Sequence, residues 1–293
     1  MRSERDTVEA LQRFFQTSFF PDVQPETVRK VEALSAPPAE ETPETCLRRG
    51  DERAAEGDIA GAIEAYRQAV RLGGQEARPH TRLADAYVYT ENSARAIAQY
   101  KKAINVAPKD AEPHFGLAEL YRRYGRVKAA IREYRVAAYL DQTNAYYRYR
   151  LADALIHTGF LHDALVELTR AVEIEPADAF YRYWLAELHL RRGEQHQALA
   201  QLEIAAELAD QDDYYHLRLG ALYLQLGQAE KAVRSIRNAI RIRPDNGSYK
   251  HILGEIYLRL GRNDAANVCY EFAGPLDAYD QDFVRRFGAE AGW

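Results

Sequence analysis

The chain has 293 residues, of which 28% are charged, with a net charge of -5 and a pI of about 6.0. This balance lacks the basic excess that is typical of nucleic-acid-binding proteins, and no apolar run approaches the roughly 18 residues of a membrane span. The length by itself suggests about two domains. Arginine supplies 32 of the 39 basic residues, a bias that favours a GC-rich bacterial genome.

The first predicted element is an amphipathic helix over residues 7–20, which ends at Pro21. Its apolar residues recur at helical spacing: Val8, Leu11, Phe14, Phe15 and Phe19. A second short helix is expected over residues 26–34, and the proline-rich residues 36–43 indicate an extended linker. The start of the chain has no continuous apolar region of the kind found in signal peptides. We therefore expect residues 1–42 to form a separate N-terminal region of a cytoplasmic protein.

From residue 43 onward the sequence repeats with a period of 34 residues and no insertion. Position fifteen is glycine in six of the seven units: Gly57, Gly125, Gly159, Gly193, Gly227 and Gly261. In the second unit this position is Glu91. The units span 43–76, 77–110, 111–144, 145–178, 179–212, 213–246 and 247–280. A fixed period of this length predicts an array of one supersecondary unit.

Each unit is predicted to contain two helices joined by a tight turn. Position eight is always small: Gly50, Ala84, Ala118, Ala152, Ala186, Gly220 and Gly254. Positions twenty and twenty-seven are always alanine, whereas position twenty-four is large: Tyr66, Tyr100, Tyr134, Leu168, Leu202, Ile236 and Tyr270. Alternating large and small side chains suit interdigitating helices. Pro108, Pro176 and Pro244 end second helices.

This pattern closely resembles the tetratricopeptide repeat (TPR) family, which has Leu and then a small residue at seven and eight, Tyr at eleven, Ala at twenty and twenty-seven, an aromatic residue at twenty-four and Pro at thirty-two. The match covers 238 of the 293 residues. The resemblance implies an all-α fold, a right-handed α-α superhelix of seven helix-turn-helix units. The tail at residues 281–293 carries Phe283, Phe287 and Trp293, so we expect it to cap the exposed face of the last repeat.

The sequence departs from the family pattern at two places. Position four, usually large and apolar, is mostly polar: Cys46, His80, His114, Arg148, Arg182, His216 and Lys250. We expect these side chains to pack through their aliphatic stems. The first unit has Arg49 and Arg53 where Leu and Tyr are usual, which indicates a solvated terminal cap.

The resemblance also implies that the first helices line a concave groove through positions two, five, nine, twelve and thirteen. Positions two and five supply aromatic residues: Phe115, Tyr146, Tyr149, Phe180, Tyr183 and Tyr214. Position nine supplies acids: Asp85, Glu119, Asp153, Glu187 and Glu255. Aromatic side chains are favoured interface anchors, so we expect this band and the first four of these acids to bind a partner.

Two alternatives stay open for these residues. The aromatic rings could simply pack between repeats, and three of the acids could be neutralised by arginines one turn later on the same helix, in the pairs Glu119–Arg123, Glu187–Arg191 and Glu255–Arg259. The groove positions carry similar numbers of acids and bases, so no strongly basic partner is implied. Acids at position nine also disfavour the clamp with which TPR co-chaperones hold a peptide carboxylate.

Enzyme motifs are missing from the sequence: it has no P-loop, no dinucleotide-binding glycine pattern, no G-x-S-x-G and no H-E-x-x-H. His80, His114 and His216 belong to different repeats, too far apart to share a metal ion. Cys46 and Cys269 lie in the first and last repeats, where a disulfide between them is not expected. We therefore expect no catalytic residue, metal or cofactor.

The sequence thus predicts a protein-interaction scaffold or assembly factor that binds a protein or peptide client in the groove. An alternative is a regulatory sensor whose N-terminal helix occupies the groove until a ligand displaces it; that helix could instead cap the first repeat or dock on a partner. A third hypothesis is RNA binding through helical repeats. Self-association could involve the terminal repeats or the N-terminal helix.

Overall fold

The computed structural model describes residues 41–293, so the helices predicted over 7–20 and 26–34 lie outside the described residues. Residues 41–293 form 15 α-helices and contain no strand. Seven helices of 13 residues each begin a pair: α2 (Pro43–Ala55), α4 (Ala77–Tyr89), α6 (Ala111–Arg123), α8 (Ala145–His157), α10 (Ala179–Arg191), α12 (Asp213–Gln225) and α14 (Gly247–Arg259). The second helices follow after short turns: α3 (Ile59–Leu72), α5 (Ser93–Val106), α7 (Val127–Leu140), α9 (Leu161–Ile174), α11 (Gln195–Leu208), α13 (Ala229–Ile242) and α15 (Asn263–Ala273). The last helix is α16 (Ala278–Glu290).

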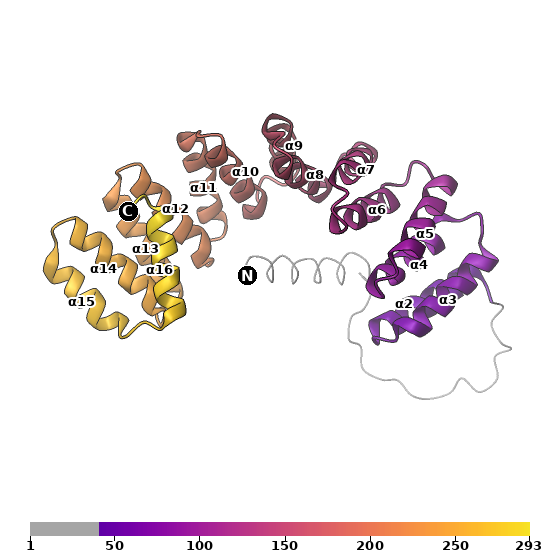
Figure 1. Cartoon of the computed structure of the whole chain (residues 1–293), viewed down its shortest axis with the longest axis horizontal. Coiled ribbons are helices and arrows are strands. Elements are labelled where there is room, and N and C mark those ends of the chain that lie inside the picture. Colours follow the sequence, from indigo (N-terminus) through magenta and orange to yellow (C-terminus); the bar gives the residue numbers. More distant parts are fainter. Residues whose placement is uncertain (1–40) are drawn as a thin grey trace. The chain divides into compact units, whose positions relative to one another are not determined.

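The described helices belong to two compact units, one ending at Asp141 and the other beginning at Gln142. The first unit contains α2 to α7 and the second contains α8 to α16. In both units the two helices of a pair make the most extensive contacts (Figure 1). Within the first unit α3 packs on α4 and α5 on α6, and within the second unit α9 packs on α10, α11 on α12 and α13 on α14. The all-α repeat architecture predicted from the 34-residue period is therefore confirmed.

The turn inside each helix pair requires a residue in the left-handed backbone region. The six glycines at position fifteen have φ between 69° and 82°, and Glu91 has φ 58°. A Cβ atom added to these glycines would meet nothing within 4 Å. The requirement is therefore conformational rather than steric, because side chains disfavour positive φ even where there is room for them.

The core of each pair is built from the small and large positions predicted to interdigitate. The alanines at position twenty are fully buried in all seven pairs, and Tyr66, Tyr100 and Tyr134 are at most 2% exposed. A Cβ atom on Gly254 would come within 2.7 Å of the Tyr270 ring. The small residue at position eight therefore leaves the room that the large residue at position twenty-four fills.

The polar residues at position four do more than pack through their stems. Four of them make a hydrogen bond to the residue nineteen positions later, on the second helix of the same pair: His80 to Gln99 at 2.7 Å, His114 to Glu133 at 2.7 Å, Arg148 to Glu167 at 2.9 Å and Arg182 to Gln201 at 3.1 Å. A buried polar group needs such a partner. These bonds join the two helices of a pair across their interface.

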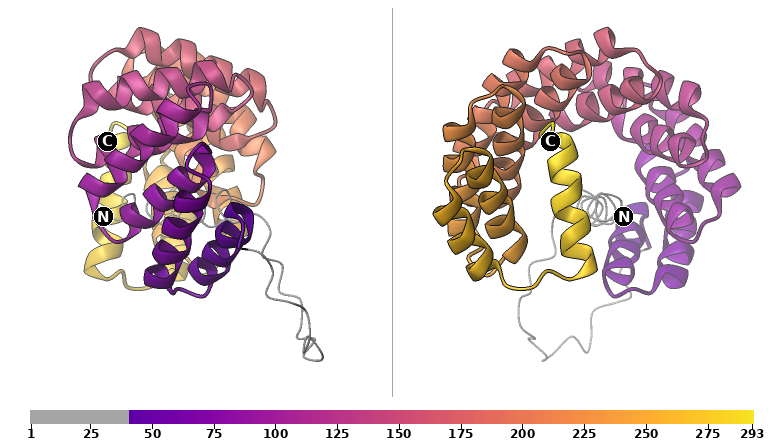
Figure 2. Two further views of the ribbon diagram at one scale, coloured as in Figure 1. Left: turned by 90° about the vertical axis from the view of Figure 1, so that its right-hand side faces the viewer. Right: turned by 60° about the vertical axis from the view of Figure 1, so that its left-hand side comes forward.

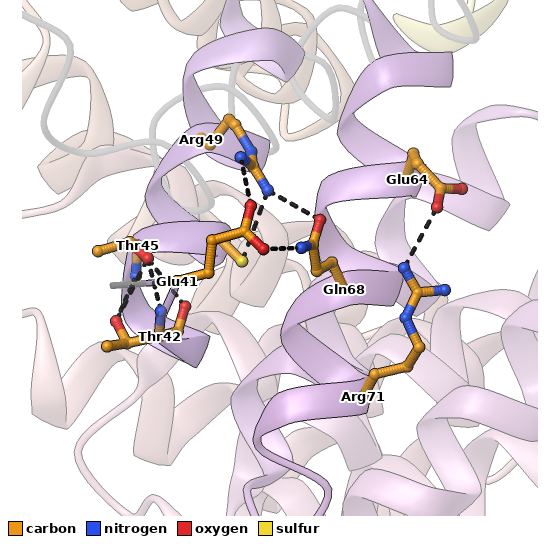
Figure 3. A network of polar contacts seen from close by, with 8 residues as sticks. Glu41, Thr42, Thr45, Arg49, Glu64, Gln68 and Arg71 are labelled. Atoms are coloured by element: carbon orange, nitrogen blue, oxygen red, sulfur yellow. Dashed lines mark hydrogen bonds and ion pairs between the residues drawn. The ribbon is translucent and has the colours of Figure 1, made fainter. Parts of the chain in front are cut away.

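The first pair begins with a network of polar contacts (Figure 3). Thr42 and Thr45 bond each other's backbone amides and so cap α2. Arg49 bonds Glu41 at 3.2 Å and Gln68 of α3 at 3.0 Å. Its side chain is 40% exposed, so this unusual residue lies at a partly solvated end of the array.

The C-terminal boundary differs from the prediction. The last unit was expected to reach residue 280 and the tail to begin at 281, but α15 ends at Ala273 and α16 begins at Ala278. Gly274 has φ 67° and Pro275 follows it, which stops α15 after 11 residues. The tail helix α16 packs on α14 and α12, beside which Figure 2 shows it in yellow.

Both cysteines are free, Cys46 buried and Cys269 partly exposed. None of the helices between residues 41 and 293 combines the length and apolar composition needed to cross a membrane.

Candidate functional site

The first helices α8, α10 and α12 bring seven aromatic residues together in the second unit. We call this group the aromatic surface; it consists of Tyr146, Tyr149, Phe180, Tyr183, Trp184, Tyr214 and Tyr215. The predicted residues Tyr146, Tyr149, Phe180, Tyr183 and Tyr214 all belong to it. Trp184 and Tyr215, at positions six and three of their repeats, were not predicted.

The rings of the aromatic surface form an unbroken series across three repeats. Tyr149 lies 4.7 Å from Phe180 and 5.6 Å from Trp184, measured between ring centroids. Tyr183 continues the series, 5.5 Å from Trp184 and 5.4 Å from Tyr214. These edge-to-face and tilted arrangements are the geometries that aromatic pairs prefer. The aromatic residues that the sequence spaces 34 positions apart are thus in mutual contact.

Exposure differs across the aromatic surface. Tyr149 is only 9% exposed and serves mainly as packing, whereas Tyr214 is 46% exposed and Tyr146, Phe180 and Tyr183 are partly exposed. The Tyr183 and Tyr214 hydroxyls are hydrogen-bonded to each other at 2.8 Å. Both the groove interpretation and the packing interpretation therefore describe part of the group, with the outer rings available to a partner.

Burial raises the pKa of the Tyr183 hydroxyl well above its ordinary value, with a further contribution from Glu187. Burial likewise raises the pKa of Tyr215 to about 12, aided by Asp212 and Asp178. These hydroxyls therefore stay protonated at neutral pH, and they can donate as well as accept hydrogen bonds.

Charged residues of both signs flank the aromatic surface. Oδ1 of Asp153 lies 3.3 Å from Nδ1 of His157. Glu187 pairs with Arg218 of the next repeat, and Arg218 also pairs with Glu290 of α16. The predicted same-helix pairing of Glu187 with Arg191 is thus replaced by a pairing between repeats.

Next to the α8 end of the aromatic surface, the Arg150 guanidinium donates a hydrogen bond of 3.0 Å to the Tyr146 hydroxyl. The same group lies 5.7 Å from the centroid of the Tyr146 ring. Acids and bases are therefore both present beside the aromatic surface.

The other predicted site residues, Asp85, Phe115 and Glu119, lie in the first unit. Phe115 is 2% exposed, with its ring 5.7 Å from that of Tyr134, and in this conformation it offers a partner almost no surface. Tyr100 donates a hydrogen bond of 2.6 Å to Asp85, and Tyr134 donates one to Glu119.

The same tyrosine-to-acid bond recurs wherever position twenty-four is tyrosine. Tyr66 donates to Asp51 at 2.7 Å and Tyr270 donates to Glu255 at 2.9 Å. Sequence reasoning missed this bond, although its signal was present: tyrosine at twenty-four coincides with an acid at nine in units one, two, three and seven. In these repeats the acid holds the second helix against the first.

Arg82 lies at the centre of an acidic group in the first unit. Its guanidinium is 4.0 Å from Asp51, 3.8 Å from Asp85 and 3.5 Å from Glu112. Three carboxyl groups share this one guanidinium at close range. Burial and, after it, the charge of Glu112 raise the pKa of Asp85 to about 7.

The expected pairings of the remaining arginines at position thirteen are also replaced. Arg123 of α6 pairs at 3.1 Å with Glu91, which lies in the turn between α4 and α5. The Arg259 guanidinium lies 4.7 Å from the centroid of the Trp293 ring. Glu255 has His251 at 3.7 Å on its own helix.

Residues 41–293 bring no three His, Cys, Asp or Glu side chains into an arrangement that could hold a metal ion. His80 and His114 each bond a residue of their own helix pair, and His216 lies 3.3 Å from the Asp210 carbonyl oxygen. An open pocket of about 650 Å³ borders the aromatic surface at Phe180 and Tyr215. Glu175, Asp178 and Asp212 are among its other lining residues.

Comparison with known proteins gives the following matches. A family model described as tetratricopeptide repeat matches residues 81–145 and 217–275. A search of curated proteins finds no match. Among solved structures, the C-terminal part of a TPR repeat-containing protein from Cytophaga hutchinsonii is 17% identical, with a TM-score of 0.65 over 80% of this chain and 98% of that one.

A tetratricopeptide repeat protein from Parabacteroides merdae is 16% identical, with a TM-score of 0.55 over 84% of this chain and 98% of that one. YrrB, described as a TPR protein with an unusual peptide-binding site, is 24% identical, with a TM-score of 0.53 over 68% of this chain and 99% of its own. At these identities the likeness concerns the fold.

Proposed function

The chain belongs to the tetratricopeptide repeat family, and we propose that it is a non-enzymatic protein-interaction scaffold or assembly factor. Its aromatic surface would hold a segment of a client protein. The observation that carries this proposal is the unbroken series of rings across α8, α10 and α12, in which Tyr149 is buried and the rings on either side of it are partly exposed. Rigid aromatic side chains provide a large contact area at a low entropic cost and are enriched among the residues that dominate binding energy.

The surroundings of the aromatic surface indicate the chemistry of the client. Protonated tyrosine hydroxyls and side chains of both charges suit a segment that combines apolar or aromatic residues with polar ones. The peptide-binding site described for YrrB belongs to a protein with a similar fold, which supports a peptide-like client here. Because the chain has a net charge of -5, we propose a protein client rather than RNA.

The nearest ionisable groups support a binding role over a catalytic one. Asp153 is paired with His157, and Glu187 with Arg218. The first pair lies within α8 and the second joins α10 to α12, so the faces of the rings are left as the surface that a client would meet. We also propose a cytoplasmic location, which agrees with the two free thiols of Cys46 and Cys269.

The experiment that tests this function compares three forms of the full chain as bait in an extract of the source cells. The test variant carries Phe180→Ala and Tyr214→Ala, which remove two accessible rings. The matched control carries Phe160→Ala and Phe272→Ala, whose rings are 58% and 71% exposed but lie outside the aromatic surface. Far-UV circular dichroism verifies that all three forms keep the same helical content.

We expect the wild type and the control to recover the same client proteins, and the test variant to lose them. Each recovered client is then purified, and its affinity for the three forms is measured. A loss of at least about tenfold, equal to about 1.4 kcal/mol, is expected for the test variant. Equal affinities for all three forms would show that the aromatic surface is not the binding site.

Deletion of residues 1–40 distinguishes the scaffold from the autoinhibited sensor that the sequence also allows. A scaffold retains its affinity for the client, whereas a sensor gains affinity when its inhibitory helix is removed. RNA binding predicts retardation of RNA in a gel at low salt and a steep loss of binding as salt is added.

A further inference from the structure

The C-terminal helix α16 lies against α12 and α14, the first helices of the sixth and seventh repeats. We call the surface under it the helix groove, and define it by the apolar residues that form one cluster with α16: Leu217, Ala221, Tyr249, Leu253 and Ile256. Phe287 and Ala291 complete this cluster from the side of α16 and are 4% and 3% exposed.

The sequence of α12 explains why a helix fits at this place. Position five holds Leu217 and position nine holds Ala221, where α10 has Tyr183 and Glu187. Small apolar side chains let a helix approach closely without burying a carboxylate. The first helix of the sixth repeat thus departs from the aromatic and acidic pattern where α16 covers it.

The buried side of α16 has the pattern of a helix that binds in a groove. Phe283, Phe287 and Ala291 recur at intervals of four residues, which places them on one face. Phe283 contacts Tyr249 with ring centroids 6.0 Å apart, and Phe287 contacts Trp293 at 5.6 Å.

Polar contacts surround this apolar stripe. Ser248 of α14 donates a hydrogen bond of 2.7 Å to Asp280, and Arg218 of α12 pairs with Glu290. The Glu290 side chain is 51% exposed, so its ion pair adds more to orientation than to affinity. The apolar stripe therefore carries most of the attachment.

The attachment of α16 to the array is also local along the chain. Residues 274–277 connect α15 to α16, and Gly274 in this connection has positive φ. Apart from its first three residues, the helix lies outside the seven 34-residue units. A helix joined in this way can leave the groove while the seven helix pairs stay folded.

We propose that the helix groove is a binding site for an amphipathic α-helix of a partner protein, and that α16 occupies this site in cis until such a helix replaces it. The partner helix carries bulky apolar residues at i and i+4 and a small residue at i+8, as α16 has Phe283, Phe287 and Ala291. It also carries a carboxylate at i+7, as α16 has Glu290. Arg218 of α12 links α10 to α16, because it contacts both Glu187 and Glu290. The proposal concerns a different site from the aromatic surface and does not rest on it.

A labelled synthetic peptide of residues 277–293 tests the proposal, with its affinity for the full-length chain measured by fluorescence anisotropy. In the wild type the tethered α16 competes at an effective concentration in the millimolar range, so binding of the peptide is weak. The variant Phe287→Ala loses the most buried anchor of α16 and is expected to bind the peptide at least about tenfold more tightly than the wild type does. A peptide that itself carries Phe287→Ala should not bind.

Two further variants make the result decisive. Phe272→Ala removes an aromatic ring of α15 that is 71% exposed, and it should bind the peptide as weakly as the wild type. Glu290→Lys places a second positive charge beside the mostly buried Arg218, so that repulsion between like charges, and not only the loss of the ion pair, loosens α16. The substituted side chain is 51% exposed, so the chain is expected to stay folded. This variant should also bind more tightly than the wild type, and it decides the outcome if Phe287→Ala unfolds. Folded variants that gain no affinity for the peptide would overturn the proposal.

Discussion

Glu91 has a backbone conformation that the other six repeats assign to glycine. Its φ of 58° places a side chain in the left-handed region, which costs about 1–2 kcal/mol. Glu91→Gly removes this cost but gives the unfolded chain more freedom, worth about 0.4–1 kcal/mol, and loses the exposed pair with Arg123. We expect a net gain of about 0.5 kcal/mol in the free energy of unfolding, measured by urea denaturation. Glu91→Ala, which keeps the Cβ atom, should show no gain; an equal gain would mean that the carboxylate, and not the backbone, is unfavourable.

Asp85 makes the stability of the first unit depend on pH. Its pKa is about 7 in the folded chain, against roughly 3.9 when unfolded. Between these two pH values the folded state holds a proton that the unfolded state releases. The contribution of Asp85 to the free energy of unfolding is therefore fully present below about pH 4 and is lost as the pH rises through 7.

The variant Asp85→Asn still accepts the Tyr100 hydrogen bond but cannot ionise. We expect it to be more stable than the wild type at pH 8, by about 4 kcal/mol, and nearly equal at pH 4. Urea denaturation across this range measures the difference. Glu112, whose pKa burial also raises, is present in both proteins and affects both curves. If the difference in free energy of unfolding between the variant and the wild type stayed constant with pH, Asp85 would be excluded as the titrating group.

At the scale of the helix, the bond between positions four and twenty-three predicts a strong coupling of the two helices in a pair. The Arg148 side chain is 9% exposed and its partner Glu167 is 17% exposed. Glu167→Met leaves the buried Arg148 charge without its acid and should cost about 3 kcal/mol. Arg148→Met should cost less, because Glu167 keeps Arg170 at 3.8 Å. The double variant replaces both charges by apolar groups and should cost much less than the sum. Thermodynamic double-mutant cycles measure this coupling, and strictly additive losses would contradict it.

The helix pairs and their turns could be predicted from the sequence, because a residue such as Gly159 or Ala164 has one local role that recurs in every repeat. The partners of polar side chains could not. Glu187 bonds Arg218 in the next repeat, and Tyr100 bonds Asp85 on the other helix of its pair, whereas sequence spacing favoured partners on the same helix. The contacts between repeats depend on rotamers and helix orientation, which a linear pattern does not specify.

In the candidate site, too, some residues could be predicted from the repeat pattern and others could not. Positions two and five located five rings of the aromatic surface, but Trp184 and Tyr215 join it through packing around Tyr183. Phe115 was predicted from the same positions and is buried. The aromatic residues of the tail predicted a cap on the last repeat, and α16 packs on α14 of that repeat. Its contact with α12 could not be predicted, because Ala221 is a single departure from the acidic pattern at position nine.

At the scale of the whole molecule, an array of repeats is stabilised by each repeat and by its contacts with the adjacent ones. Leu83 in the first unit and Leu202 in the second are both 2% exposed. Replacing either by alanine should cost about 2–5 kcal/mol, but the loss should be confined to the neighbourhood of the substitution. Hydrogen exchange followed by mass spectrometry measures protection separately in each helix.

We expect Leu202→Ala to reduce protection in α10, α11 and α12 and to leave α2 and α3 unchanged, because those helices belong to the other compact unit. Leu83→Ala is the matched control and should give the reciprocal result, with loss in α2 to α5 and none in α12 to α15. If either substitution lowered protection uniformly along the chain, the protein would unfold as one cooperative body, and neither α16 nor a client could open one part of the array while the rest stays folded.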